Sequence, residues 1–85
     1  MKEVRVLGVY VNDRVKDASR IQPILTKYGC SIRTRLGLHN QETGYATDSG
    51  LILLELSGDP AECQRLENEL LTIDELDVQK MIFLK

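Results

Sequence analysis

The first hydrophobic segment of the chain is apolar on two faces. In residues 4–11 (VRVLGVYV), positions 4, 6, 8 and 10 fall on one face of an extended strand, and positions 5, 7, 9 and 11 fall on the other. Both sets are mostly apolar, which is typical of an interior strand covered on both sides. Asn12 and Asp13 follow, and their side chains favour a turn and a helix cap. The pattern predicts a buried strand that leads into a helix.

A helical period follows over residues 15–28. Apolar side chains recur there at three- and four-residue spacing, and polar residues such as Asp17 fall mostly between them, as in an amphipathic helix. Gly29 supplies a C-terminal stop. Pro23 falls inside the period, where its ring crowds the carbonyl four residues back, so we expect a kink between Ser19 and Pro23. The apolar positions are Val15, Ala18, Ile21, Ile24, Leu25 and Tyr28.

Two further strands are expected in the middle of the chain. Residues 30–38 alternate between an apolar and a basic face, which predicts a half-buried strand that begins at Cys30. Residues 39–49 have little apolar content and predict a loop that includes His39. Residues 50–57 (GLILLELS) predict a second, largely buried strand.

A second helix has clear start signals. Asp59 suits the N-cap, Pro60 the first helical position, and Glu62 lies three residues after the cap. We expect this helix to stop near Thr72, and residues 76–84 (LDVQKMIFL) predict the last strand. The buried stripe of the helix is Cys63, Leu66, Leu70 and Ile73.

The resulting order of elements is β-α-β-β-α-β. Two right-handed helical crossovers most economically build one antiparallel sheet with strand order 4-1-3-2 and both helices on one face. We therefore predict an α+β, ferredoxin-like domain. One apolar sheet face then has no helix over it, and a large exposed apolar face is uncommon on monomers. A second copy is the simplest cover, so we expect a homo-oligomer.

The composition narrows the class of partner. Eighty-five residues suit one domain, residues 1–85, with an ordinary globular content of 42% hydrophobic and 28% charged residues. A formal net charge of −2 gives no overall field that attracts nucleic acid. Glu3 and Arg5 interrupt the N-terminal apolar run, so it does not resemble a signal peptide, and no run approaches the roughly 20 residues that cross a bilayer. We expect a soluble cytoplasmic domain without direct nucleic-acid or membrane binding.

The residues that carry catalytic or metal chemistry are few. His39 is the only histidine, so no cluster of histidine with cysteine or aspartate can form. Cys30 and Cys63 lack the spacing of a metal or disulfide framework, and we expect both to be reduced and packed as small apolar residues. No serine has a nucleophile motif, and Glu67 and Glu69 are interpreted as part of a solvated helix face. We expect no catalytic residue, no metal ligand, no cofactor and no enzyme activity.

Two places in the sequence suit a polar ligand. Arg33 and Arg35 lie two residues apart on a strand and can clamp one carboxylate or phosphate, whereas protection of an edge strand is the alternative. The turn from Gly8 to Asp13 allows close backbone approach before a helix N-terminus, whereas an ordinary strand–helix turn is the alternative. The candidate ligand-binding residues are Gly8, Tyr10, Asn12, Asp13, Arg33 and Arg35.

Four short motifs occur in an order that resembles a known family. They are the VLGVYVNDR start, the KYG turn after the first helix, the IRTRLGL strand and the GLILLELSGD strand. Over nearly the whole chain these motifs resemble the iron-only hydrogenase system regulators, which are ACT-like proteins. The resemblance implies a ferredoxin-like domain related in shape to ACT domains and to the ligand-binding domain of nickel-responsive repressors. It also implies dimers or tetramers and a regulatory role in hydrogenase expression or maturation that acts through a partner.

The chain departs from these relatives at two sites. The nickel site of the repressors uses several histidines with a cysteine, and this chain has only His39. ACT domains bind an amino acid beside the turn that matches Gly8 to Asp13. Here the helix start reads Asp13-Arg14-Val15-Lys16, without the glycine that lets a ligand approach. An amino acid therefore stays a ligand hypothesis, and no metal is expected.

These observations favour a small non-catalytic regulatory or ligand-sensing domain. Its ligand would lie between the Gly8 to Asp13 turn and Arg33 or Arg35 of a neighbouring copy. The alternative is an adaptor module that has no small-molecule ligand and binds a protein partner by its sheet face or edge. An enzyme is the third class, and the lack of a defined pair of base and nucleophile disfavours it.

Overall fold

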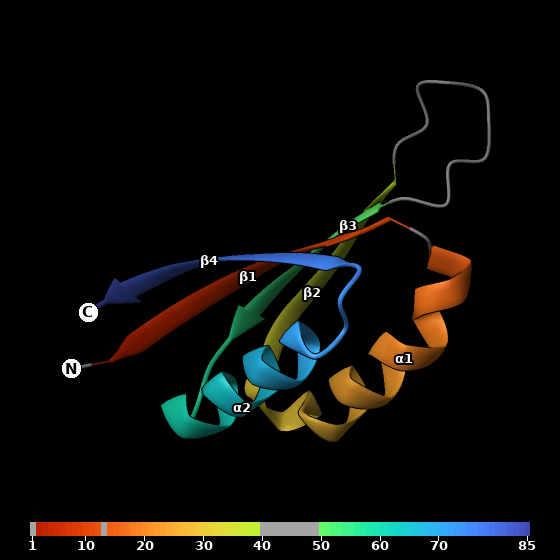
Figure 1. The fold of residues 1–85 in the computed structure, drawn as a ribbon. Coiled ribbons are helices and arrows are strands. Elements are labelled where there is room, and N and C mark those ends of the chain that lie inside the picture. The colour runs from red at the N-terminus through yellow and green to blue at the C-terminus, as the bar shows by residue number, and fades with distance from the viewer. Residues whose placement is uncertain (1, 13, 40–49) are drawn as a thin grey trace.

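The structure is a computed structural model that describes residues 2–12, 14–39 and 50–85. It has the predicted order of strands and helices, with one short 3-10 turn before the second strand (Figure 1). The elements are β1 (Glu3–Val11), α1 (Arg14–Lys27), η1 (Gly29–Ser31), β2 (Ile32–His39), β3 (Gly50–Leu56), α2 (Pro60–Leu71) and β4 (Leu76–Leu84).

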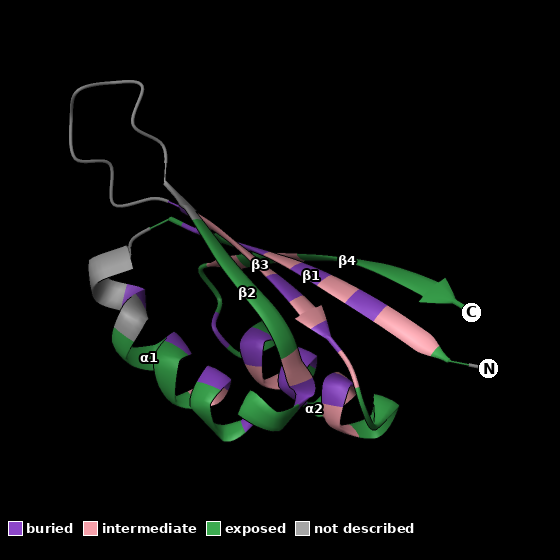
Figure 2. Cartoon of the chain, turned by 180° about the vertical axis from the view of Figure 1, so that it is seen from behind, coloured by how far each residue is buried: buried purple, intermediate pink, exposed green. Residues whose placement is uncertain are grey.

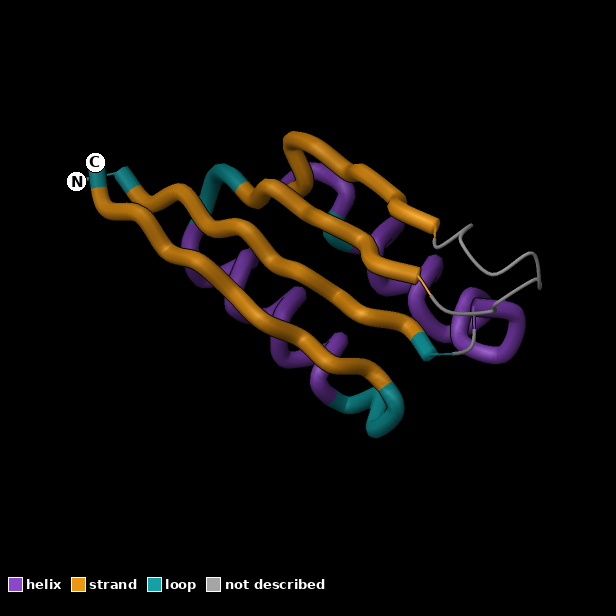
Figure 3. The backbone as a smooth tube through the Cα atoms, turned by 90° about the horizontal axis from the view of Figure 1, so that it is seen from above, coloured by secondary structure: helices purple, strands orange, loops and turns teal. Residues whose placement is uncertain are grey.

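The strands form one sheet in the order β2-β3-β1-β4, and every neighbouring pair is antiparallel. Both helices lie on one side of this sheet (Figure 3). The predicted order 4-1-3-2 is the same order counted from the opposite edge, so the ferredoxin-like fold class is confirmed. β1 and β3 are the central strands, as their doubly apolar patterns require.

The core lies between the sheet and the two helices. The odd-numbered residues of β1 face the helices, and β3 adds Leu54 and Leu56 beside them. α2 contributes the predicted stripe, and Figure 2 shows the buried residues gathered along the inner sides of the helices and strands. The buried hydrophobic residues are Leu7, Val9, Val11, Ile21, Leu25, Tyr28, Leu54, Leu56, Cys63, Leu66, Leu70 and Ile73.

Local chemistry explains where the helices begin and end. The Asp59 side chain accepts a hydrogen bond of 2.9 Å from the Ala61 N–H, and Pro60 begins α2, as predicted. α2 ends at Leu71 with Thr72 as its C-cap, close to the expected stop. α1 continues across Pro23 as one 14-residue helix, and the kink expected between Ser19 and Pro23 stays a prediction.

β2 differs from its prediction in three ways. It begins at Ile32, because Gly29–Ser31 forms the 3-10 turn and leaves Cys30 exposed instead of packed. Its residues 33–37 are all exposed, so the half-buried strand is wrong; in the described part of the chain β2 is an edge strand that pairs only with β3. His39 ends β2, opposite Gly50, where a loop was expected. The rest of that predicted loop, residues 40–49, lies outside the described residues.

β1 and β4 are the two longest strands and run past the end of β3. They pair from Glu3 opposite Leu84 to Val11 opposite Leu76, whereas β3 pairs with β1 only as far as Arg5. The ends of β1 and β4 therefore project as a two-stranded ribbon beyond the helices (Figure 1). Within the described ranges, neither helix has the length and apolar content that a membrane span requires.

Candidate functional site

The sheet face opposite the helices is the largest candidate binding surface. In its central rows Val6 lies opposite Met81 on β4, and Gly8 and Tyr10 lie opposite Leu53 and Leu51 on β3. No helix of the described chain covers this face (Figure 3). The large apolar residues exposed on it are Tyr10 (43%), Leu36 (50%), Met81 (55%) and Phe83 (45%). The uncovered apolar face expected from the sequence is thus confirmed, and it belongs to the even-numbered residues of β1.

The predicted ligand residues of the first turn separate in space. Gly8 and Tyr10 belong to the uncovered face, by their register with β3. Asn12 instead donates from Nδ2 to the Glu75 carbonyl at 3.1 Å, which ties the end of β1 to the segment before β4. Asp13 lies outside the described residues.

The two predicted arginines lie on the far edge of the sheet. β3 separates β2 from β1, and both Arg33 and Arg35 are exposed. Arg35 lies opposite Leu54 on the helix side and donates from Nη1 to Gln22 Oε1 on α1 at 3.1 Å. Arg35 and Tyr10 therefore serve opposite faces of one chain. A site that combines them needs the arginine of a neighbouring copy, as the ligand hypothesis assumed.

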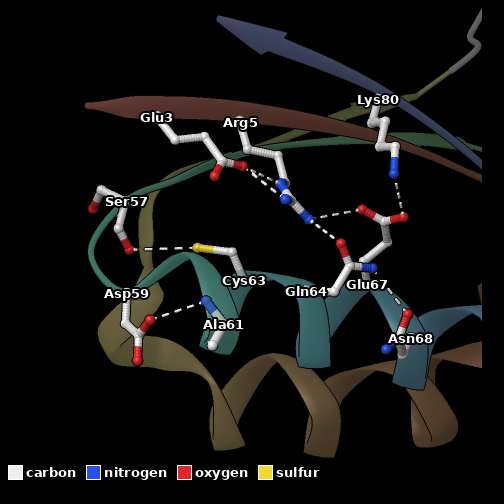
Figure 4. A network of polar contacts seen from close by, with 10 residues as sticks. All are labelled: Glu3, Arg5, Ser57, Asp59, Ala61, Cys63, Gln64, Glu67, Asn68 and Lys80. Carbon is white, nitrogen blue, oxygen red and sulfur yellow. Dashed lines mark hydrogen bonds and ion pairs between the residues drawn. The ribbon is translucent and has the colours of Figure 1, made fainter. Parts of the chain in front are cut away.

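The buried ion network on the helix side was not predicted. Arg5 on β1 and Glu67 on α2 are 6% exposed each, and Arg5 Nη1 lies 3.1 Å from Glu67 Oε1 (Figure 4). The Arg5 guanidinium also lies 2.7 Å from Glu3 Oε1 and donates to Gln64 Oε1 at 3.0 Å. Lys80 on β4 lies 3.0 Å from Glu67 Oε2. The network joins β1 and β4 to α2.

This network is balanced in charge and in hydrogen bonds. Two cations and two carboxylates share it, and both Glu67 oxygens have a partner. Buried charges are tolerated when they are paired and hydrogen-bonded in this way. Because Arg5 and Glu67 already satisfy each other, the network fixes β1 and β4 against α2 and offers no free group for chemistry.

Two residues of the helices were misjudged from the sequence. Glu67 is buried, so its assignment to a solvated face is wrong; its position four residues after Cys63, on the buried stripe, was the available signal. Asp17 is 0% exposed, although it was grouped with the polar residues outside the apolar stripe. It lies four residues before Ile21 on the inner face of α1, and neither of its carboxylate oxygens has a hydrogen-bond partner in the described part of the chain.

A polar latch joins the end of α1 to α2. Lys27 Nζ lies 3.2 Å from Glu69 Oε2, and it also lies 5.3 Å from the centre of the Tyr28 ring. Hydrogen bonding from Tyr28, and then from Lys27, lowers the pKa of the Glu69 carboxyl below its ordinary value. The same contacts raise the pKa of Lys27 and of Tyr28, since each gains from the Glu69 carboxylate.

The latch predicts a pH-dependent effect of Glu69→Gln. A carboxyl whose pKa is lowered by folding stabilises the folded state above its unfolded pKa, and this stabilisation is lost as the pH falls through the folded value. Glu69→Gln should therefore reduce the free energy of unfolding at pH 7 and have a smaller effect near pH 3. Urea denaturation of both proteins across this range measures the difference, with Glu62→Gln as an exposed control. A difference that is constant with pH would contradict the assigned cause.

The cysteines and acidic residues give no reactive centre in the described regions. The Cys63 thiol is buried, its pKa is raised by burial, and it donates to the Ser57 carbonyl at 3.7 Å. A raised pKa keeps a thiol protonated and unreactive. Among residues 2–12, 14–39 and 50–85, no three His, Cys, Asp or Glu side chains lie close enough to hold a metal ion.

Comparisons with known proteins define the class of fold. No protein-family model matches the chain, and no curated protein matches its sequence. The ACT domain of prephenate dehydrogenase from Bacillus anthracis is similar, with a TM-score of 0.58 and 18% identity over 87% of this chain and 99% of that one. The chain is thus a small ACT-like, ferredoxin-like domain.

Two further solved structures match over nearly the full length. The uncharacterized protein TM1266 from Thermotoga maritima superposes with a TM-score of 0.82 and 23% identity, over 99% of this chain and all of that one. A dimeric ferredoxin-like protein from an uncultured marine organism superposes with a TM-score of 0.50 and 10% identity, over 100% and 96% of the two chains. At these identities the likeness establishes the fold.

Proposed function

We propose that this protein is a non-catalytic regulatory domain, an iron-only hydrogenase system regulator, that works as a homo-oligomer and responds to a small molecule or a protein partner. The observation that supports this proposal is the uncovered apolar sheet face of an ACT-like fold. Tyr10, Leu36, Met81 and Phe83 are each more than two-fifths exposed there. An apolar patch of this kind marks an interaction site more often than a free surface.

The ligand hypothesis follows from the same geometry. Tyr10 and Gly8 open on the uncovered face, whereas Arg35 lies at the β2 edge with its guanidinium near α1. A neighbouring copy can bring its arginine to the Gly8 to Tyr10 region and complete a site for a carboxylate, such as that of an amino acid. The protein would then sense its ligand only when assembled.

The oligomer is tested by placing a charge on the uncovered face. Leu53 lies opposite Gly8 there, and Glu55 already occupies the same face two residues further on, so Leu53→Asp should fold. We expect the parent protein to have a mass of two or four chains by light scattering, and Leu53→Asp to have half the mass of the parent. Leu71→Asp, at a 53% exposed site on α2, should leave the mass of the assembly unchanged. A single-chain mass for the parent protein at micromolar concentration would overturn the proposal.

The adaptor alternative differs in its response to small molecules. A ligand that binds only the folded state raises stability by about 2.7 kcal/mol when it is present at a hundred times its Kd. Thermal unfolding with amino acids and nucleotides should therefore show a rise in Tm, and Arg35→Gln should reduce it. An intact oligomer that no such compound stabilises would favour the adaptor. Loss of the gene without any change in hydrogenase level or maturation would contradict the hydrogenase role.

A further inference from the structure

The outer edge of β4 is the second surface that has no partner among the described residues. Within these residues β4 is at the end of the sheet and pairs only with β1. Lys2 and Lys85 exchange both backbone hydrogen bonds, at 2.7 and 2.8 Å, which fixes the pattern of the whole ladder. Because hydrogen-bonded and non-hydrogen-bonded pairs alternate, every second residue of β4 directs its N–H and C=O outward. The outward residues are Leu76, Val78, Lys80, Ile82 and Leu84.

The two edges of the sheet are chemically different. β2 carries a register irregularity between Ile32 and Thr34, and Arg33 and Arg35 lie on it. Bulges and charged residues are features that keep an edge strand from pairing. β4 is nine residues long, pairs with β1 in continuous register and contains no proline, and its charged residues, Asp77 and Lys80, precede the apolar segment Met81–Leu84. The β4 edge therefore retains the backbone groups for another strand, and the β2 edge is protected.

The exposed apolar residues of β4 gather in its C-terminal half. Met81 and Phe83 are exposed on the uncovered face, and Ile82 and Leu84 are exposed on the opposite side. Figure 2 shows the C-terminal part of β4 as exposed. A partner that covers only the uncovered sheet face leaves Ile82 and Leu84, on the opposite side, exposed to water. A strand beside β4 covers its edge and places neighbouring side chains beside those of β4 on each face.

We propose that the β4 edge pairs antiparallel with β4 of a second copy, around a two-fold axis at Met81, so that two sheets become one. This interface is distinct from the uncovered sheet face and does not depend on the proposed function. A two-fold axis is the symmetry that most dimers use, and it satisfies the outward groups of both edges at once. Two copies joined in this way have one continuous uncovered face.

The register follows from charge and length. Outward residues must face outward residues, so an even-numbered residue lies opposite an even-numbered residue of the partner. An axis at Lys80 places two ammonium groups opposite each other, which is unfavourable. An axis at Met81 places Lys80 opposite the partner's Ile82 and Val78 opposite the partner's Leu84. All four residues of the apolar segment Met81–Leu84 then face the partner strand, and Lys80 keeps its ion pair with Glu67.

Cysteine crosslinking tests the register directly. In a Cys30→Ser background, which removes the exposed native thiol, Met81→Cys places two thiols opposite each other in a non-hydrogen-bonded pair. Gln79→Cys is the matched control, on the same face of the same strand but four residues from its own copy across the axis. Mild oxidation should give at least about tenfold more covalent dimer for Met81→Cys than for Gln79→Cys, since disulfides do not form between Cα atoms more than about 7 Å apart.

Two additional substitutions distinguish an interface at the β4 edge from an interface at the uncovered sheet face. Ile82→Pro removes an outward N–H that makes no bond to β1, so it should abolish the crosslink while the circular dichroism of the folded protein is retained. Leu53→Asp, on the uncovered face, should leave the crosslink intact. Equal crosslinking of Met81→Cys and Gln79→Cys, or loss of the Met81→Cys crosslink with Leu53→Asp, would overturn the proposal. If Ile82→Pro does not fold, the proposal is still tested by the crosslinking yields of Met81→Cys, of Gln79→Cys, and of Met81→Cys combined with Leu53→Asp.

Discussion

Glu67→Ala is expected to lower the free energy of unfolding by about 3 kcal/mol, because it leaves the buried Arg5 guanidinium without its carboxylate on α2. The side chains of Arg5 and Glu67 are only 7% and 8% exposed, so water cannot replace the lost partner. Glu3 still pairs with Arg5, but α2 loses its ionic contact with both β1 and β4. Urea denaturation at a fixed protein concentration measures the loss, and the fixed concentration removes any contribution from assembly.

The exposed pair on the same helix is the control for this prediction. Glu62 Oε1 lies 2.6 Å from Arg65 Nη1, yet the side chains are 44% and 57% exposed. Exposed pairs of this kind contribute about 0–1 kcal/mol, so Glu62→Ala should have a small effect. The double change Arg5→Met with Glu67→Leu should recover part of the loss, since apolar residues can replace a buried pair when both partners are removed together. Equal losses for Glu67→Ala and Glu62→Ala would show that the buried network is not important for stability.

Most helices and strands of the fold could be predicted from local sequence patterns. β4 was predicted with its observed bounds, because an apolar strand pattern follows a helix with clear start signals and an expected stop near Thr72. Asp59 and Pro60 place the start of α2 by their own chemistry, without help from the rest of the protein. β1 and β3 are apolar on both faces, and this property placed them at the centre of the sheet. Each of these signals depends only on a few neighbouring residues in the sequence.

The errors concern residues whose surroundings come from distant parts of the chain. Glu67 lies opposite Arg5, 62 residues away in the sequence, and neither residue indicates its partner by spacing. Leu36 has the alternating pattern of a half-buried strand, but an edge position leaves it 50% exposed. Asp17 is polar, as expected of a solvent-facing residue, but its spacing along the helix places it on the inner face. The prediction from its polarity was wrong, because the position along a helix decides which face a residue occupies.

The candidate site was the least predictable part of the molecule. Tyr10 and Arg35 were grouped because both suit a ligand, and one chain places them on opposite sides of the sheet. Sequence spacing describes one strand at a time and says nothing about a second copy. The same limit applies to the β4 edge. Its outward groups became apparent only when the ladder from Lys2 and Lys85 showed which residues bond to β1.

Leu66→Ala is expected to lower the free energy of unfolding by about 3 kcal/mol, through loss of buried apolar area and the cavity left behind. Leu66 is 0% exposed and lies on the face of α2 that packs into the core with Leu70. Alanine keeps the helix propensity high, so the loss reports packing and not a failure to form the helix. Chemical denaturation at neutral pH and fixed protein concentration measures it.

Leu71→Ala is the control that makes the Leu66 result specific. Leu71 is on the same helix and undergoes the same change in side chain, but it is 53% exposed. An exposed leucine has little area to lose, so its replacement should change the free energy of unfolding by less than about 0.5 kcal/mol. If both variants lost the same stability, the helix itself and not the core between α2 and the sheet would limit folding. If only Leu66→Ala does, the contact of α2 with β1 and β3 stabilises the scaffold that carries the uncovered face and the β4 edge.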